Sequence, residues 1–253
     1  MKLLLPKNTF SEFFEKLIDK NNIDEVNYLP SSQISKALEL DSDSFGLIPS
    51  CDLLTHHDLN ISSKLGISFD GLISPSYFYF SNNFGADAKV HVYGDVTSND
   101  LILSKILINE RYDIDIELIL ETKPRNETIE NFLICGDENF KSNLFERGIS
   151  FADQVAEYMN MPYVNYVMVS KNEEIIKEIN RQSLNFDMKF EDSIENLLTQ
   201  STFSNEVKEF INLNIGSIYF AMTDIETESL SETIKLPYYH GMIKDLHELK
   251  FID

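Results

Sequence analysis

Apolar residues near the N-terminus follow two different periods. Residues 3–5 form a short continuous apolar run. Five further apolar residues then recur at helical spacing: Phe10, Phe13, Phe14, Leu17 and Ile18. The run is typical of a buried strand, and the spacing gives a helix one apolar face. The pattern therefore predicts a strand followed by a helix from about Phe10 to Asp19. Thr9 with Glu12 fits the T-x-x-E capping box, which predicts Thr9 as the helix cap.

Short apolar runs and amphipathic stretches continue to alternate up to about residue 80. Val26–Leu29 predicts a second strand, the segment PSSQISKALEL a second helix, and Ser44–Ser50 a third strand. Further strands are predicted at Ile67–Asp70 and Ser76–Phe80. Strands and helices in alternation indicate an α/β fold with a parallel sheet and helical crossovers.

A second unit is predicted to follow. The segment SNNFGADA interrupts the pattern; a strand at KVHVY, a helix at LILSKILIN and strands at IDIELIL and NFLIC come after it. Helix Ser150–Asn160 and strand Tyr163–Val169 are predicted to complete this unit, and SKNEE to lead the chain back to the first. The remaining pattern is helical, at Glu173–Gln182, Ser193–Gln200, Asn205–Asn212 and Thr223–Lys235.

The order of these elements predicts two lobes. Residues 1–82 and 171–253 are expected to form lobe 1, and residues 83–170 to form lobe 2, inserted into it. Two α/β lobes joined by two crossings enclose a cleft. Ligands of such folds bind at the carboxyl ends of the strands that face the cleft.

The charge balance excludes several classes of partner. The 253 residues include 42 acidic and 21 basic ones, for a formal net charge of -21. Nucleic acids and anionic membranes both need clustered Lys and Arg, so neither partner is expected. The chain has neither a membrane-length apolar segment nor a secretory signal pattern. Cys51 and Cys135 lie far apart and the five His residues lack metal-site spacing, so a reduced cytoplasmic protein without a metal site is expected.

Polar turns follow several of the predicted strands. They comprise Lys7-Asn8-Thr9, Pro49-Ser50, Asp70-Gly71, Ser74-Pro75-Ser76, Thr97-Ser98-Asn99-Asp100 and Gly136-Asp137. Free N–H groups and partial positive charge at helix N-termini can bind an anion without arginine, although each such residue alone is also an ordinary cap. The chain lacks a G-x-S-x-G, P-loop or G-x-G-x-x-G motif. The residues therefore predict a two-lobed protein that binds a small anionic molecule.

Several segments resemble, in the same order, those of the menaquinone-biosynthetic chorismate dehydratases. They are YLPSSQISKALELDSDSFGLIPSCDLL, ISFDGLISPSYFYFS, FLICGDENF, ADQVAEYMNMPYVNYVMVSKNEE and IYFAMTDIETESLSETIKLPYYH. The resemblance covers nearly the whole chain and implies a two-lobed, periplasmic-binding-protein-like type II fold used as a cytoplasmic enzyme. It implies a lyase that dehydrates chorismate to 3-[(1-carboxyvinyl)oxy]benzoate in the futalosine route, with no metal or organic cofactor.

The same resemblance implies roles for individual residues. Asn8 falls on the Asn of the family's Y-L-N turn, and Ser76 opens the aromatic strand that follows DG. Both are expected in the active site, orienting a substrate whose own carboxylate is thought to act as the base. The expected substrate-binding residues are Thr9, Ser50, Thr97, Ser98, Asn99, Gly136 and Asp137.

The sequence also departs from the family close to the expected site. DGLISPS is one residue longer than the usual segment and lacks the basic residue often found there, FDG replaces SDG, and the chain has no Trp. Four alternatives therefore stay open: a diverged binder of a small carboxylate, a non-catalytic solute-binding protein, the next pathway enzyme of the same fold, and a structural or regulatory protein. The next pathway enzyme usually carries a His near its pocket, and the five His residues of this chain match no such position. The sequence leaves open whether the chain forms a homodimer.

Overall fold

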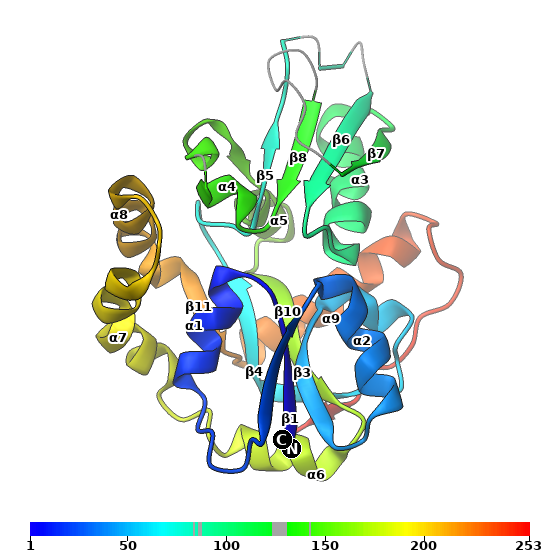
Figure 1. Cartoon of the computed structure of the whole chain (residues 1–253). Coiled ribbons are helices and arrows are strands. Elements are labelled where there is room, and N and C mark those ends of the chain that lie inside the picture. Colours follow the sequence, from blue (N-terminus) through cyan, green and yellow to red (C-terminus); the bar gives the residue numbers. More distant parts are fainter. Residues whose placement is uncertain (83, 86–87, 123–130, 142) are drawn as a thin grey trace.

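The computed structural model describes residues 1–82, 84–85, 88–122, 131–141 and 143–253, and they form two lobes stacked on one another (Figure 1). We call the part built on the sheet that contains both chain ends lobe 1, and the other part lobe 2. The sheet of lobe 1 has the strand order β11-β4-β10-β3-β1-β2, with β12 beside β4. The bounds are β1 Lys2–Pro6, β2 Glu25–Leu29, β3 Ser44–Pro49, β4 Asn60–Phe69, β10 Tyr163–Ser170, β11 Ile218–Ala221 and β12 Phe251–Ile252.

Lobe 2 has a smaller sheet with the order β7-β6-β8-β5-β9. Its strands are β5 Ser76–Tyr79, β6 Lys89–Gly94, β7 Glu117–Glu121, β8 Asn131–Cys135 and β9 Ile149–Ser150, and its helices are α3 Ser98–Tyr112, α4 Glu138–Lys141 and α5 Phe151–Met159. The helices of lobe 1 are α1 Thr9–Leu17, α2 Ser31–Leu40, α6 Glu173–Asn180, α7 Phe186–Gln200, α8 Asn205–Leu213 and α9 Asp224–Tyr239. Short 3₁₀ turns occur at η1 Ser50–Leu54, η2 Leu144–Arg147 and η3 Ile215–Ser217.

The parallel β-α-β-α-β unit predicted for the first third of the chain is confirmed. Strand β1 pairs in parallel with both β2 and β3. The predicted apolar face of α1 is also confirmed, because Phe10, Phe13 and Phe14 are all buried. The complete sheet is mixed, since β10 runs antiparallel to β3 and β4, and β11 runs antiparallel to β4.

Two strands lie in a different lobe from the one that the predicted boundaries assign. Strand β5 pairs with β8 and β9 in lobe 2, although residues 1–82 were predicted for lobe 1. Strand β10 lies between β3 and β4 in lobe 1, although residues 83–170 were predicted for lobe 2. Apolar runs show that a strand is buried but not which strand it pairs with. The chain therefore crosses between the lobes before β5 and again between α5 and β10.

Aromatic side chains join the two lobes. The ring of Phe10 on α1 lies 6.0 Å from that of Phe140 on α4, which in turn lies 5.9 Å from that of Phe203 in lobe 1. The rings of Phe145 in lobe 2 and Phe210 on α8 stack with their centroids 4.4 Å apart. Offset and edge-on aromatic pairs add to the stabilisation from buried area. The apolar core thus continues from one lobe into the other.

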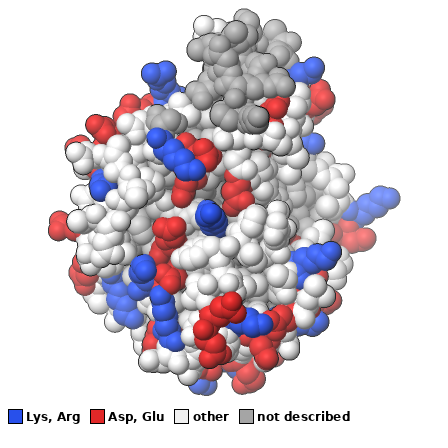
Figure 2. Space-filling model, in the orientation of Figure 1, with Lys and Arg blue, Asp and Glu red and all other residues white. Residues whose placement is uncertain are grey.

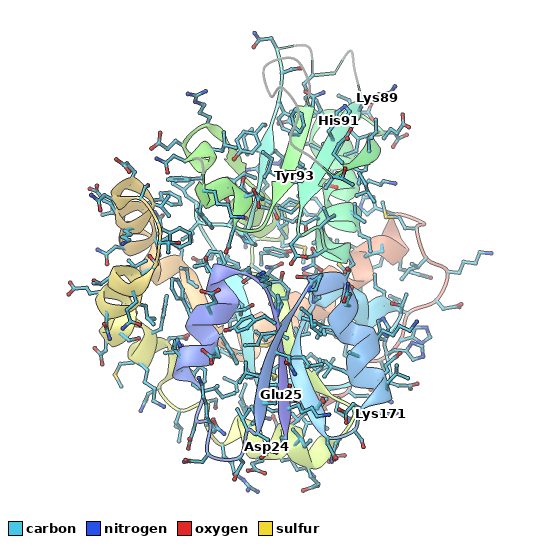
Figure 3. All side chains as sticks on the ribbon, in the orientation of Figure 1. Asp24, Glu25, Lys89, His91, Tyr93 and Lys171 are labelled. Carbon is cyan, nitrogen blue, oxygen red and sulfur yellow. The ribbon has the colours of Figure 1, made fainter. Side chains whose placement is uncertain are left out.

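Charged residues of both signs occur on the face of the molecule seen in Figure 2. Figure 2 shows acidic and basic side chains intermingled on the described part of one face. Of the residues labelled in Figure 3, Asp24, Glu25 and Lys171 lie toward the base of lobe 1, and His91 lies within lobe 2, where its Nδ1 is 2.9 Å from Glu121. None of the described helices is both long and apolar enough to cross a membrane. The described residues also contain no group of three His, Cys, Asp or Glu side chains placed to hold a metal ion.

Candidate functional site

A small polar cavity lies between the lobes. It is lined by Asn8, Pro75, Ser76, Asp95, Thr97, Asp100, Gly136, Asn165 and Tyr166. Its volume is about 10 Å³, close to the smallest space that holds one water molecule. The described lining residues include carboxylates, amides and hydroxyls but no Lys or Arg. In this closed arrangement the residues of the cavity mainly contact one another.

Asn8 contributes to the cavity and to the start of α1 at the same time. Its backbone is extended, its Oδ1 accepts a hydrogen bond from Ser11 N at 2.9 Å, and its Nδ2 donates to the Tyr166 hydroxyl at 3.3 Å. Asn8 is therefore the N-cap of α1, and the predicted Thr9 cap is wrong. Thr9 is the first helical residue, and its Oγ1 donates to Asp137 Oδ2 of lobe 2 at 3.0 Å. The local T-x-x-E pattern gives no sign of this acceptor from the other lobe.

Ser76 is held by a buried carboxylate. Its Oγ donates to Asp100 Oδ1 at 2.7 Å, while Asp100 Oδ2 accepts from the backbone N and the Oγ1 of Thr97 at 2.8 and 2.6 Å. Thr97 is the N-cap of α3, so the turn that positions Thr97 also positions Asp100. All three side chains are at least 95% buried. Because it donates its proton to Asp100, the Ser76 hydroxyl can still accept a hydrogen bond from a ligand.

Burial raises the pKa of the Asp100 carboxyl above its usual range, even though the hydrogen bonds from Thr97 and Ser76 lower it in part. The folded protein therefore holds this proton more tightly than the unfolded chain, whose Asp titrates near pH ~4, and stability falls as the pH rises from there. We predict that the free energy of unfolding of the wild type, relative to that of Asp100→Asn, increases as the pH is lowered from 7 to 4. Urea unfolding of both proteins across this range measures the difference; a difference independent of pH would contradict the prediction.

Asp95 connects lobe 2 to the start of α2. Its Oδ2 accepts from Ser31 Oγ at 2.6 Å, and its Oδ1 accepts from Ser31 N at 3.1 Å. Ser31 Oγ in turn lies 3.0 Å from the Tyr166 hydroxyl, which also accepts from Asn8. A chain of hydrogen bonds thus runs from Asn8 through Tyr166 and Ser31 to Asp95. It couples the cavity wall of lobe 1 to the opposite lobe.

The other residues predicted for the site lie around the cavity. Gly136 lines it directly with a φ of 75°, a left-handed conformation that favours glycine. Ser50 and Asn99 form a fully buried layer beside it: Asn99 Oδ1 accepts from Ser50 Oγ at 3.2 Å, and Ser50 Oγ also donates to Val164 O at 2.8 Å. Ser98 is half-buried and does not line the cavity. The structure therefore brings Asn8, Ser76, Thr97 and Gly136 into one cavity, and keeps Ser50, Ser98 and Asn99 out of it.

A larger groove adjoins the cavity. Its volume is about 580 Å³, within the range of small-molecule sites. It is lined by Thr9, Glu12, Phe13, Lys16, Asp137, Phe140, Lys141, Leu197, Gln200, Ser201, Thr202, Phe203 and Ser204. Thr9 and Asp137, both predicted from the sequence, belong to this groove and bond to each other across it. Their chain neighbours Asn8 and Gly136 line the inner cavity.

Three polar residues that line the cavity were not predicted from the sequence. They are Asp95, Asn165 and Tyr166. Asp95 lies between the predicted strand KVHVY and the predicted Thr97-Ser98-Asn99-Asp100 turn, so its position after a strand was a usable signal. Asn165 and Tyr166 sit inside an apolar strand, where a polar residue signals either a buried hydrogen bond or a site. The predicted boundaries placed β10 in lobe 2, so these two residues were not expected on the lobe 1 side of the cavity.

Comparisons with known proteins identify the fold. No protein-family model matches the chain, and no curated protein matches it. Among solved structures, protein AF1704 from Archaeoglobus fulgidus superposes with a TM-score of 0.63 at 13% identity, covering 96% of this chain and 98% of that one. The chain has a two-lobed, periplasmic-binding-protein-like type II fold.

Two sulphonate-binding proteins show the same likeness. The periplasmic aliphatic sulphonate binding protein SsuA from Escherichia coli gives a TM-score of 0.60 at 12% identity, covering 97% of this chain and 88% of that one. The alkanesulfonate-binding protein SsuA from Xanthomonas axonopodis pv. citri, bound to MOPS, gives 0.61 at 11% identity, covering 97% and 94%. Identities this low support the shared fold alone. The predicted fold class is thereby confirmed, and these neighbours bind small molecules.

Proposed function

We propose that this chain binds chorismate between its lobes and dehydrates it to 3-[(1-carboxyvinyl)oxy]benzoate, as a hydro-lyase of the futalosine route to menaquinone. One observation carries the proposal. Asn8 of lobe 1 and Ser76 of lobe 2, the two residues that the family resemblance assigns to catalysis, line the same interlobe cavity. The two residues are 68 positions apart in the chain, so their position in the sequence alone did not place them in the same cavity. A cytoplasmic location stays part of the same proposal.

The hydrogen bonds of the two residues give them complementary roles. The Oδ1 of Asn8 is used by Ser11 N, so Asn8 offers its Nδ2 to the cavity as a donor. The Oγ proton of Ser76 is given to Asp100, so Ser76 offers an acceptor. A donor suits a carboxylate or ether oxygen of the substrate, and an acceptor suits its hydroxyl group. The pair can therefore fix both the orientation and the leaving group of a hydroxy acid.

The proposed reaction needs no side chain of the protein to form a covalent bond with the substrate or to accept its proton. The electron pair of a ring C–H bond forms the new double bond, and the C–O bond breaks with its pair on the departing hydroxyl. The substrate's carboxylate accepts the proton, and proton and hydroxide leave together as water. Asn8 and Ser76 hold the substrate in the conformer in which these groups align, in a space from which bulk water is excluded.

The decisive experiment incubates the purified protein with chorismate, follows the loss of diene absorbance and identifies the product by mass. We expect a product lighter by one water, and a large loss of rate in Ser76→Ala. The matched control is Ser63→Ala, which removes another Ser–Asp bond, from Ser63 Oγ to Asp253 Oδ1 at 2.7 Å, away from the cavity. The control should keep the wild-type rate. Absence of the dehydrated product from the wild-type reaction would refute the proposed activity.

A second candidate function is a non-catalytic binder of a small carboxylate or related acid. The sulphonate-binding neighbours favour it, because both are sulphonate-binding proteins on this fold. This candidate predicts a rise in melting temperature with chorismate or a related acid but no turnover. If chorismate and related acids gave neither turnover nor a shift in melting temperature, both candidates would be excluded for these acids.

A further inference from the structure

Lobe 2 places two of its own carboxylates on helix starts of lobe 1. Asp137 Oδ1 accepts from Thr9 N and its Oδ2 from Thr9 Oγ1, both at 3.0 Å. Asp95 accepts in the same way from the N and Oγ of Ser31, at 3.1 and 2.6 Å. Thr9 begins α1 and Ser31 begins α2, helices of nine and ten residues. Each contact therefore joins a carboxylate to both the backbone and side-chain donors of a first helical residue.

These contacts use donors that an anionic ligand would otherwise find free. The first N–H groups of a helix have no partner within it and carry partial positive charge, so they favour a carboxylate. Charge-assisted hydrogen bonds to such donors are shorter and stronger than neutral ones. In the closed structure the backbone N and the hydroxyl of both Thr9 and Ser31 already have partners within the chain. Closure therefore does not require a ligand to complete the hydrogen bonding between the lobes.

The Asp137–Thr9 contact also separates the two spaces between the lobes. Both residues line the outer groove of about 580 Å³. The residues before each of them, Gly136 and Asn8, line the inner cavity of about 10 Å³. We therefore expect that parting Asp137 from Thr9 connects the groove with the cavity that Asn8 and Ser76 line. The inner cavity alone is too small for any organic ligand.

We propose that Asp95 and Asp137 form a two-point latch that holds the lobes closed in the absence of ligand and must part before a ligand reaches the inner cavity. The latch lowers the population of the open, binding-competent form, and hence the apparent affinity for any ligand of the cavity. This inference rests on the contacts between the lobes and not on the chemistry proposed for the cavity. It holds for a dehydratase and for a binder alike.

Apolar contacts offer the competing explanation for closure. Phe140 and Phe145 of lobe 2 pack against Phe10, Phe203 and Phe210 of lobe 1. If this aromatic interface alone held the lobes together, removal of the carboxylates would leave them closed. The two explanations therefore predict different results for the same variant.

The test compares the ligand-free wild type with the double variant Asp95→Ala/Asp137→Ala. We expect an increased radius of gyration in small-angle X-ray scattering. We also expect about tenfold faster amide exchange at cavity-lining residues of both lobes, equal to about 1.4 kcal/mol. The matched control is Asp41→Ala, whose carboxylate accepts from Ser44 Oγ at 2.8 Å within lobe 1. The control should keep wild-type scattering and wild-type exchange in the cavity.

An isosteric pair guards against a variant that fails to fold. Asp95→Asn/Asp137→Asn keeps one acceptor oxygen at each point but removes the charge, so we expect a smaller change in the same direction. Unchanged scattering, with faster exchange confined to the amides of Thr9 and Ser31, would overturn the latch and leave closure to the aromatic interface. Because chorismate is absent from these measurements, the latch and the proposed dehydratase activity can fail independently.

Discussion

Replacing Asn8 with alanine is expected to lower the rate of chorismate turnover by about a hundredfold or more, in a protein that remains folded. The variant removes the Nδ2 donor that points into the cavity toward Tyr166. Loss of one pre-oriented donor to a developing charge typically costs ~10²–10³ in rate. The same variant removes the Oδ1 cap of α1, which costs about 1 kcal/mol, against a total stability of about 5–15 kcal/mol. Steady-state rates and thermal melting of both proteins measure the two effects.

Two further variants separate the donor from the cap. Asn172→Ala removes the Asn that caps α6, whose Oδ1 accepts from Glu174 N at 3.0 Å outside the cavity, so it should lower stability to a similar extent and leave turnover unchanged. Asn8→Asp keeps a capping oxygen and the side-chain shape but loses the amide donor. We expect it to melt near the wild type and turn over as slowly as Asn8→Ala. Wild-type turnover by Asn8→Asp would limit Asn8 to the role of a helix cap.

Local patterns were sufficient to predict most of the elements. The apolar face of α1 and the strand at β8 appear in the sequence because each depends on spacing within a few residues. The parallel pairing of β1 with β2 and β3 follows from helical crossovers between consecutive strands. Strand β11 was missed because its four residues lie between helices and are too few to show the alternation of apolar and polar residues that indicates a strand. The two-lobed fold itself was predicted from the family resemblance as well as from the order of elements.

Contacts between distant residues account for the errors. The cap of α1 was assigned to Thr9 because the sequence gives no sign that Asp137, 128 positions later, accepts from its hydroxyl. Asp95 and Tyr166 were missed because their importance depends on the hydrogen-bond chain through Ser31, which joins both lobes. Asn8 and Ser76 were found because the resemblance marked them, and only the fold shows that they line one cavity. Their catalytic roles remain predictions for the experiments above.

The second large effect is expected at Gly94, where the fold and the interlobe contacts depend on the same backbone. Gly94 ends β6 opposite Cys135 with a φ of 107°, and an added Cβ would lie 1.9 Å from the Cys135 carbonyl oxygen. Gly94→Ala therefore combines an unfavourable backbone conformation with a clash that only a shift of β6 away from β8 can relieve. We expect a loss of about 3 kcal/mol or more in the free energy of unfolding, measured by denaturant titration.

The same shift should release Asp95, the next residue, whose N donates to Cys135 O at 3.3 Å and whose carboxylate holds Ser31. Gly94→Ala should thus open the lobes as well as weaken the fold, and the radius of gyration should rise under conditions in which the variant is still folded. Gly216→Ala is the matched control, because its Cβ would meet no atom within 4 Å. It should change neither stability nor scattering. A Gly94→Ala protein that loses stability but stays closed would show that the lobes remain together without the β6–β8 pairing behind Asp95.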